Sequence, residues 1–297
     1  MRVLNFGSLN VDYVYKVDHI LVRGETLQSG SRRIFSGGKG LNQSVALARA
    51  GLEVYHAGST GQGGEFLTGV LEDAGVHTDF VRVLKDTPCG HTVIQNDKDG
   101  DNCILLFGGA NQCITDEQVD EVLSHFGSED TLVLQNEINA NVKIMEKAHE
   151  KGLTIVLNPS PFDEKIAALP LSYVDIFFMN EIEAAQMAGI RSDDPDALLD
   201  SLEAKFPEAR LVLTLGGAGS VCSFRGERTR QQIYPVHAVD TTAAGDTFTG
   251  FFLSGILRGL DTKEALDLAS RASAVAVTRP GAAPSIPTLK EVEAYRF

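Results

Sequence analysis

The chain has no tryptophan, few cysteines and no long apolar run. Its four cysteines form no CxxC pair and have no histidine at zinc-ligand spacing, which argues against a structural zinc site and favours reduced thiols. No stretch approaches the ~20 apolar residues that span a bilayer. The opening MRVLNFGSLNVD also lacks the apolar core of a signal peptide. We therefore expect a cytoplasmic protein without a membrane partner.

Positive charge is also scarce. The chain has 26 Lys and Arg residues and 40 Asp and Glu residues, which gives a formal net charge of −14. This balance argues against a general affinity for nucleic acid or for anionic membranes. An anionic ligand would need a local positive field from helix N-termini, a metal or a few basic side chains. The 297 residues, 43% of them hydrophobic, can bury a substantial core in one large domain.

Two familiar nucleotide-binding motifs are missing. The P-loop pattern GxxxxGK[ST] fails because Lys39 is followed by Gly40. The dinucleotide pattern GxGxxG fails because GSTGQGGEF does not hold its spacing. These absences argue against a Walker-type NTPase and a dinucleotide-binding dehydrogenase.

Continuous apolar segments such as TLVLQ (131–135) and RLVLTL (210–215) alternate with helical patterns, which indicates a parallel sheet covered on both faces. The segments 11–17 and 89–107 alternate instead, so one of their faces should meet water, and a hairpin-like KDGD (98–101) divides the second. We predict an α/β fold, a mainly parallel sheet flanked by helices on both faces. It forms one domain over 1–297, with a small β-sheet lid from insertions at about 12–35 and 89–107.

Local signals set several expected boundaries. Gly51 should end the helix that follows GGK, and Thr115 with Gln118 predicts a capping box. Asp194-Pro195 should open another helix. An antiparallel pair is expected from SVCSFRG and RQQIYPVHAV, followed by two long helices at about 245–258 and 262–278.

The segment SGGKGLNQ (36–43) lies where a loop becomes a helix. One interpretation is a glycine-rich turn before an ordinary helix. The other is a backbone that approaches a polar ligand, with Asn42 offering a donor and an acceptor to a hydroxyl group. The residues alone leave both open.

The segment DTTAAGD (240–246) precedes a helix. Ala243, Ala244 and Gly245 would direct free N–H groups at an anion, aided by the helix dipole. Asp246 cannot itself hold a phosphate, because like charges repel, but it fits a general base that takes a proton from a hydroxyl nucleophile. The alternative is a capping aspartate in a tight turn.

Together the two segments resemble the two signatures of the PfkB-type carbohydrate kinases, the ribokinase-like family, as GGKGLNQ and DTTAAGDTFTGFF. The resemblance runs from Val3 to at least Pro287, and GSLNVD, GGAN (108–111) and AVTRPGAAPS (276–285) are similar to the ribose-phosphorylating members. It implies an ATP-dependent kinase that transfers the γ-phosphate to the terminal hydroxyl of a small sugar, D-ribose, giving ribose 5-phosphate.

The resemblance also implies the site. Asp246 would be the catalytic base, and an anion hole would be formed by Gly245, Ala244 and Ala243. Besides Asp246, the sugar-binding residues would be Asn10, Asp12, Gly38, Lys39, Asn42 and Glu137. Nucleotide would be bound by Asn180, Thr214, Gly216, Gly219 and Gly245. Mg²⁺ would accompany ATP near Glu183, which could act through a bridging water. A monovalent cation, K⁺, would lie among Asp240, Thr242, Ala276, Arg279, Gly281 and Ser285.

The residues support these roles to different degrees. Asn10 and Asp12 are two apart, so on an extended segment they face one side and could bind a diol; otherwise they form a polar turn. Glu183 lies one helical turn after Asn180, and a solvated helical glutamate is its ordinary interpretation. Asp240 could equally be a simple turn residue.

Some positions depart from the family pattern. Arg23-Gly24-Glu25-Thr26 replaces Pro-Gly-Glu-Thr in the lid, and Ser44 replaces the usual alanine, which we expect to be nearly neutral. Alternatives are a family member acting on a nucleoside, 2-deoxyribose, fructose or a ketohexose acid, and a non-catalytic sugar-binding regulator. A nucleoside kinase remains an alternative because Tyr13 and Tyr15 could stack on a base. The open lid sheet predicts a homodimer through the lid.

Overall fold

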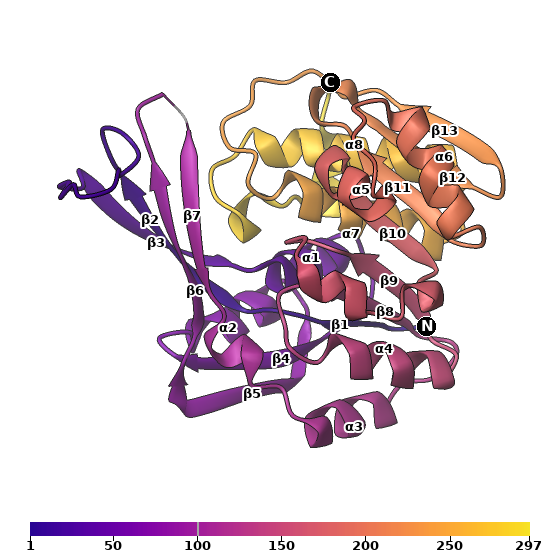
Figure 1. The fold of residues 1–297 in the computed structure, drawn as a ribbon, viewed down its shortest axis with the longest axis horizontal. Helices are drawn as coiled ribbons and strands as arrows, with labels where there is room; N and C mark the ends of the chain where they lie inside the picture. The colour runs from indigo at the N-terminus through magenta and orange to yellow at the C-terminus, as the bar shows by residue number, and fades with distance from the viewer. Residues whose placement is uncertain (100) are drawn as a thin grey trace.

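The computed structural model describes residues 1–99 and 101–297. In these residues nine strands form one sheet in the order β13-β12-β11-β10-β9-β8-β1-β4-β5, with helices on both faces (Figure 1). Its pairs are parallel except for β11–β12 and β12–β13. The strands are β1 Val3–Phe6, β4 Val54–Gln62, β5 His77–Pro88, β8 Thr131–Gln135, β9 Thr154–Asn158, β10 Ile176–Asn180, β11 Arg210–Thr214, β12 Ser220–Phe224 and β13 Glu227–Gln231. The predicted fold class is confirmed.

A second sheet has the order β3-β2-β6-β7 and projects from the main body (Figure 1). Its strands are β2 Asn10–Lys16, β3 Ser31–Gly37, β6 Gly90–Asn96 and β7 Asn102–Phe107. β2 is parallel to β6 and antiparallel to β3, whereas β6 and β7 are antiparallel. The predicted hairpin turn at 98–101 includes residue 100, which lies outside the described residues.

The two faces of the large sheet carry different helices. One face is covered by α1 Lys39–Arg49, α2 Phe66–Asp73, α7 Ala244–Leu257, α8 Thr262–Val277 and α9 Leu289–Ala294. The other is covered by α3 Asp116–Ser124, α4 Asn141–Glu150, α5 Glu181–Ala188 and α6 Pro195–Lys205. Gly51 follows α1 with a positive φ of 94°, and Asp194 caps α6, as the sequence predicts.

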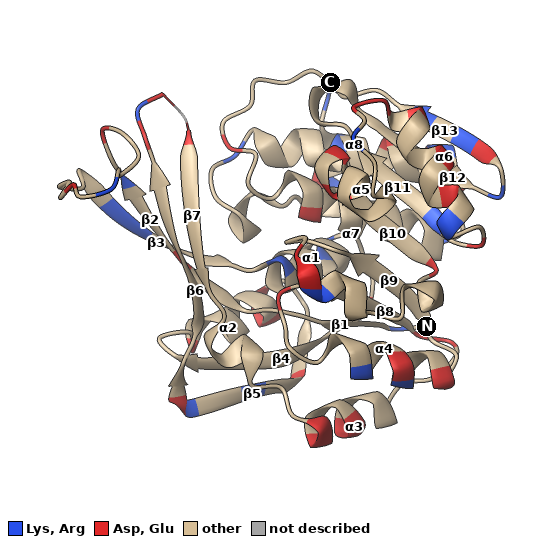
Figure 2. Cartoon of the chain, viewed as in Figure 1, with Lys and Arg blue, Asp and Glu red and all other residues tan. Residues whose placement is uncertain are grey.

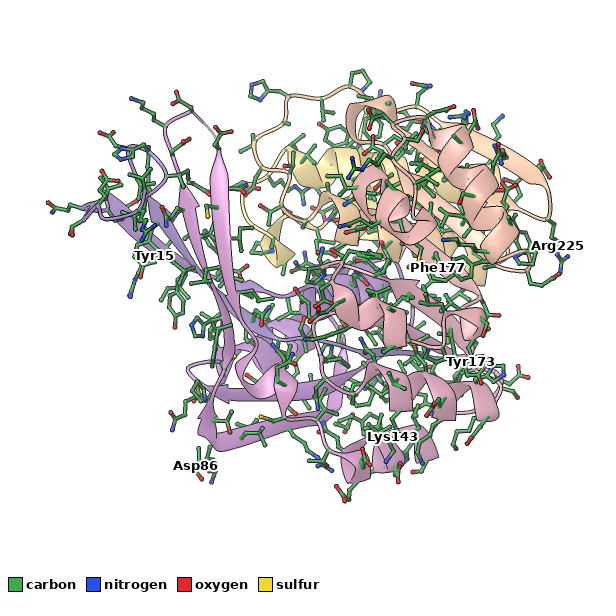
Figure 3. All side chains as sticks on the ribbon, in the orientation of Figure 1. Tyr15, Asp86, Lys143, Tyr173, Phe177 and Arg225 are labelled. Atoms are coloured by element: carbon green, nitrogen blue, oxygen red, sulfur yellow. The ribbon has the colours of Figure 1, made fainter. Side chains whose placement is uncertain are left out.

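Successive residues of the parallel strands enter opposite cores. On β10, Phe177 belongs to the core under helices α3 to α6. Its neighbours Ile176 and Phe178 belong to the core on the other face, which carries α1, α2, α7, α8 and α9. Phe177 is fully buried in the main body, whereas Tyr15 lies on the projecting sheet (Figure 3). A strand buried on both faces has no polar alternation, which is why these segments read as continuous apolar runs.

Two local predictions are wrong in part, although Thr115 does cap its helix and β12 and β13 form the expected antiparallel pair. Thr115 accepts the predicted hydrogen bond from the Gln118 amide, but the Gln118 side chain bonds to the carbonyl oxygen of Gly58 instead of closing a capping box. The strand expected from RQQIYPVHAV is β13, which begins earlier, at Glu227. Arg225 and Gly226 both have positive φ, 53° and 78°, and form a tight turn that fixes this register.

No helix in residues 1–99 and 101–297 is long and apolar enough to cross a membrane. The missed elements include the edge strand β5 and the short helices α5 and α9. The residues of β5 are mostly half-buried or exposed, so its sequence HTDFVRVLKDTP lacks the apolar signal of the central strands.

Helices α1 and α7 pack at unusually close range at Gly250. A Cβ atom on Gly250 would lie 2.5 Å from the Ala46 Cβ and 2.8 Å from the Ala46 carbonyl carbon. Close approach of the two helices therefore requires glycine here. This contact matters for function because the same two helices carry the polar residues of the site described below.

We predict that Gly250→Ala lowers the free energy of unfolding by ~1–3 kcal/mol, because the backbone clash outweighs the gain in helix propensity. The matched control is Gly69→Ala in α2, where an added Cβ would meet nothing within 4 Å. That variant should gain ~0.5–1 kcal/mol. Urea unfolding of both variants measures the difference, and a stabilised Gly250→Ala would contradict the close packing.

Candidate active site

Polar side chains gather where the parallel strands of the large sheet end. Gln135 ends β8 and is paired in register with Asn158, the last residue of β9. Asn180 ends β10 and is paired with Thr214, which ends β11. Apolar strands therefore deliver a row of amides and a hydroxyl to one edge of the sheet, where open α/β folds bind their ligands.

A pocket of about 120 Å³ lies at this edge. Of the residues predicted from sequence, it is lined by Lys39, Asn180, Glu183, Thr214, Thr242, Gly245 and Asp246. It is also lined by Asn158, Phe178, Met179 and Thr249, which the sequence analysis missed. The position of Asn158 at a strand end was a signal that could have identified it.

Asp246 lies in the first turn of α7 and is buried. Its Oδ2 accepts a hydrogen bond from Asn42 Nδ2 at 3.0 Å, and its Oδ1 accepts one from Gln43 Nε2 at 3.0 Å. Burial raises the pKa of Asp246, while the charge of Lys39 and the two amides oppose that rise. The site thus holds a desolvated carboxylate whose two oxygens are oriented by α1.

Asn42 uses one of its two amide hydrogens inside the protein. Its Nδ2 donates to Asp246 Oδ2, which leaves one N–H of this group without an acceptor among the described residues. Its Oδ1 is buried and has no hydrogen-bond partner among the described residues. A buried unsatisfied acceptor costs free energy, and a ligand hydroxyl would satisfy it.

Lys39 begins α1 and lies among three carboxyl groups. Its backbone N–H donates to Glu137 Oε2 at 2.9 Å, and the Ser8 hydroxyl donates to the same oxygen. Burial would lower the pKa of Lys39, but Asp246, Glu137 and Glu183 outweigh it and raise that pKa. Burial raises the pKa of Glu137 against the opposing charge of Lys39. The Lys39 ammonium group is therefore kept charged where it lines the pocket.

Asn10 and Asp12 lie on β2, two residues apart as predicted, and each bonds to another polar side chain. Asn10 Oδ1 accepts from Asn111 Nδ2 at 2.7 Å, and Asp12 Oδ1 accepts from the Thr92 hydroxyl at 2.6 Å. Burial raises the pKa of Asp12 to about 6, although the Thr92 bond lowers it. A Cβ on Gly37 would overlap the Asp12 carboxylate, so glycine leaves room for this group.

The N-terminus of α7 has fewer free amides than predicted. The N–H of Ala244 donates to the Thr241 carbonyl oxygen at 3.1 Å, so the prediction of three free donors is wrong for Ala244. The N–H groups of Ala243 and Gly245 have no acceptor in the described part of the chain. Gly38, at the start of α1, has a φ of 91° and lies against Ser8 and Asn10.

Asp240 links two loops beside α7. Its Oδ1 accepts from the Thr242 N–H at 3.0 Å and its Oδ2 from the Gly281 N–H at 2.9 Å. Burial would raise the pKa of Asp240, but a hydrogen bond from the Thr242 hydroxyl and the two N–H bonds outweigh it and lower that pKa. The Ala276 carbonyl accepts from the Arg279 N–H, and the buried Ser285 hydroxyl donates to Ala282.

Asn180 and Glu183 form a capping box at the start of α5. Asn180 Oδ1 accepts from the Glu183 N–H at 2.8 Å, and Glu183 Oε2 accepts from the Asn180 N–H at 3.1 Å. Both residues still line the pocket. Gly216 and Gly219 follow β11, and a Cβ on Gly219 would overlap the Gln231 carbonyl oxygen. Gly219 also has a φ of 95°, so its backbone conformation requires glycine.

Three known proteins are similar to this chain over nearly its whole length. A ribokinase of Staphylococcus aureus is 33% identical over 302 residues, which cover 98% of each chain. The structure of the Arabidopsis thaliana ribokinase complexed with ribose and ATP has a TM-score of 0.86 at 29% identity, covering 98% of this chain and 97% of that one. A Burkholderia thailandensis nucleoside kinase, solved with inosine, has a TM-score of 0.84 at 20% identity and covers 98% and 95%, which shows a shared fold only.

The comparison with family models covers nearly the whole chain. Residues 2–289 match the model of the pfkB family carbohydrate kinases. This match spans both glycine motifs, the second sheet and every residue that lines the pocket. The chain belongs to the pfkB family of carbohydrate kinases.

Proposed function

We propose that this protein transfers the γ-phosphate of ATP to the terminal hydroxyl of D-ribose, giving ribose 5-phosphate. The observation that carries the proposal is the buried Asp246 carboxylate at the N-terminus of α7, between Lys39 and the polar ends of the strands. Relatives named ribokinase that align with nearly the whole chain support ribose as the acceptor. Two relatives named deoxyribokinase are less similar, each at 27% identity.

Asp246 is the general base in this proposal. Its carboxylate takes the proton of the sugar hydroxyl as the oxygen attacks the γ-phosphorus, and the bond from phosphorus to the bridging oxygen of ADP breaks. The Gly245 and Ala243 N–H groups and the positive end of α7 stabilise the charge on the transferred phosphoryl group. Ala244 contributes through the turn that aims its neighbours, since its own N–H is bonded. Lys39 adds a full positive charge.

The sugar would be bound between the first turn of α1 and the second sheet. Asp12, Asn10 and Glu137 offer oxygen acceptors to its hydroxyl groups, and the unsatisfied Oδ1 of Asn42 accepts one more. Gly38 allows the backbone to approach closely. We propose that the second sheet is a lid inserted into a single domain, and that its closure excludes water from the phosphoryl donor.

The nucleotide would lie over the ends of β10 and β11, on Asn180, Thr214, Gly216 and Gly219. Magnesium bound with ATP neutralises charge on its β- and γ-phosphates. Among the described residues, no group of three or more His, Cys, Asp or Glu side chains could hold a metal alone. Glu183 fits a supporting role, because its Oε1 has no hydrogen bond in the described residues and could hold the ion through water.

We predict ribose-dependent ATP consumption by the purified protein with Mg²⁺, tested against 2-deoxyribose, fructose, adenosine and uridine. Asp246→Asn should cut kcat by ~10²–10⁴-fold, because the amide cannot accept the proton, while ATP affinity is retained. Coupled assays and calorimetry measure the two effects. Turnover with another acceptor would replace ribose as the substrate, and near-native turnover of Asp246→Asn would remove the proposed base.

We also propose a K⁺ site in the Asp240 loop, formed by the carboxylate of Asp240 and oxygens of Thr242, Ala276, Arg279, Gly281 and Ser285. The lowered pKa of Asp240 keeps the group charged, which suits a cation. The bound ion would hold the turn that precedes α7. Turnover should be faster in K⁺ than in tetramethylammonium at equal ionic strength. Asp240→Asn should lose that difference, whereas equal wild-type rates in both salts would reject the site.

We further propose a homodimer formed through the lid. On β7, Ile104, Leu105 and Phe107 are 57%, 69% and 49% exposed, and no charged residue lies on that strand (Figure 2). Light scattering at micromolar concentration should give the mass of a dimer, and Leu105→Glu should give a monomer. Ile182→Glu, an exposed position on α5, is the matched control and should stay dimeric. A monomeric wild type would contradict the proposal.

A further inference from the structure

A chain of buried polar side chains leads from Asp246 into the interior, away from the pocket. We name it the amide chain, and its members are Gln43, Gln135, Asn5, Ser44 and His56. All are at most 1% exposed. Except for Gln43, none touches Asp246, and none lines the pocket. Burying five polar side chains is costly unless their hydrogen bonds are satisfied, so the direction of each bond carries information.

The carboxylate at one end fixes those directions. Asp246 can only accept, so Gln43 must present Nε2 to it, at 3.0 Å. Gln43 Oε1 then faces Gln135 Nε2, which donates to it at 2.6 Å. Gln135 Nε2 also donates to Asn5 Oδ1, at 3.1 Å. Both bonds of Gln135 use its Nε2, and its Oε1 is buried without a hydrogen-bond partner among the described residues, so the neighbours alone set this orientation.

The far end of the chain is consistent with the same direction. Asn5 Nδ2 donates to the Gly40 carbonyl at 2.7 Å and to the Ser44 hydroxyl at 2.8 Å. Ser44 Oγ lies 2.8 Å from His56 Nδ1, and Ser44 donates there when neutral His56 carries its proton on Nε2. Burial lowers the pKa of His56 to about 4, so it is neutral at physiological pH. The serine that replaces the family's alanine therefore has a partner of its own.

A second contact fixes Gln43 in the same orientation. Gln43 Nε2 also donates to Asn158 Oδ1 at 3.1 Å. Asn158 presents that oxygen because its Nδ2 donates to the Phe178 carbonyl at 2.9 Å. A flip of the Gln43 amide would put its oxygen against the Asp246 carboxylate and against Asn158 Oδ1. It would also put its nitrogen against a donor on Gln135.

We propose that Gln43 is a positioning residue for the catalytic base, and that Gln135 and Asn5 behind it keep its N–H directed at Asp246. Gln43 holds one carboxylate oxygen while Asn42 holds the other, so that the lone pair that takes the proton has a fixed direction. This inference rests on the proposed role of Asp246. It assigns a task to a side chain that faces away from the sugar and the nucleotide.

The direct test is Gln43→Met, which keeps an unbranched side chain on α1 and removes the donor. Losing a hydrogen bond to the charged form raises the pKa of Asp246, so the base is deprotonated only at higher pH. The acid limb of the kcat–pH profile should move up by about one unit. At a pH on the acid limb kcat should therefore fall roughly 10-fold, with the KM for ATP unchanged. The charges of Lys39 and Glu183 also act on the pKa of Asp246, but both residues are unchanged between the wild type and Gln43→Met, so they do not contribute to the shift.

Gln135→Met tests the chain without touching Asp246. It leaves Gln43 Oε1 without its donor, so the acid limb should move the same way by a smaller amount. Gln118→Met is the matched control, since Gln118 is also 1% exposed and its amide donates to the Gly58 carbonyl, with no link to the site. Its acid limb should stay at the wild-type position even if its stability falls.

The outcomes separate this inference from the proposed function. If Asp246→Asn is inactive and Gln43→Met shows the shifted limb, the positioning role is supported. Two results would overturn the positioning role while Asp246→Asn is inactive. One is an acid limb of the kcat–pH profile that stays at the wild-type position in both Gln43→Met and Gln135→Met. The other is an acid limb that moves by the same amount in the control Gln118→Met. If Gln43→Met does not fold, the limb of Gln135→Met decides. Retained turnover in Asp246→Asn would instead refute the base itself.

Discussion

The site depends on burying one carboxylate, Asp246, where helices α1 and α7 meet. Removing a carboxylate from water costs several kcal/mol unless opposite charge and hydrogen bonds replace the water. Here Asn42 and Gln43 supply two donors from one helix, and Lys39 supplies the opposite charge. Those partners reach Asp246 only because α1 packs directly on α7, which requires glycine at position 250. Helix packing and the placement of this buried carboxylate are therefore linked in this fold.

The large sheet provides the rest of the site through the alternation of its strands. Residues on opposite sides of each strand enter two separate cores, so the strand interiors are apolar and rigid. Polar residues appear where these strands end, and parallel strands bring those ends to one edge. Asn158, Asn180 and Thr214 meet α1 and α7 there. The second sheet adds Asn10 and Asp12 from outside this body, which suits a part that closes over a bound sugar.

Much of the fold was predictable from the sequence, because buried parallel strands and capped helices leave strong local patterns. The glycine motifs likewise led to Lys39, Gly245 and Asp246, which line one pocket. What the sequence could not show depends on contacts between distant residues. The side chain of Gln118 bonds to Gly58 across 60 positions, which no local capping rule anticipates. Ser44 was expected to be nearly neutral on its helix of small residues, and its partners, Asn5 and His56, lie in other elements where the local sequence does not show them.

The measurement that tests the account most directly is the position of the transferred phosphate. The protein would be incubated with Mg²⁺, ATP and D-ribose labelled with ¹³C at C5, and the products examined by ³¹P and ¹³C NMR. A base beside the terminal hydroxyl predicts one sugar phosphate, with coupling between phosphorus and the labelled carbon. Phosphate on another carbon, or inorganic phosphate alone, would contradict the placement of the sugar's terminal hydroxyl against Asp246.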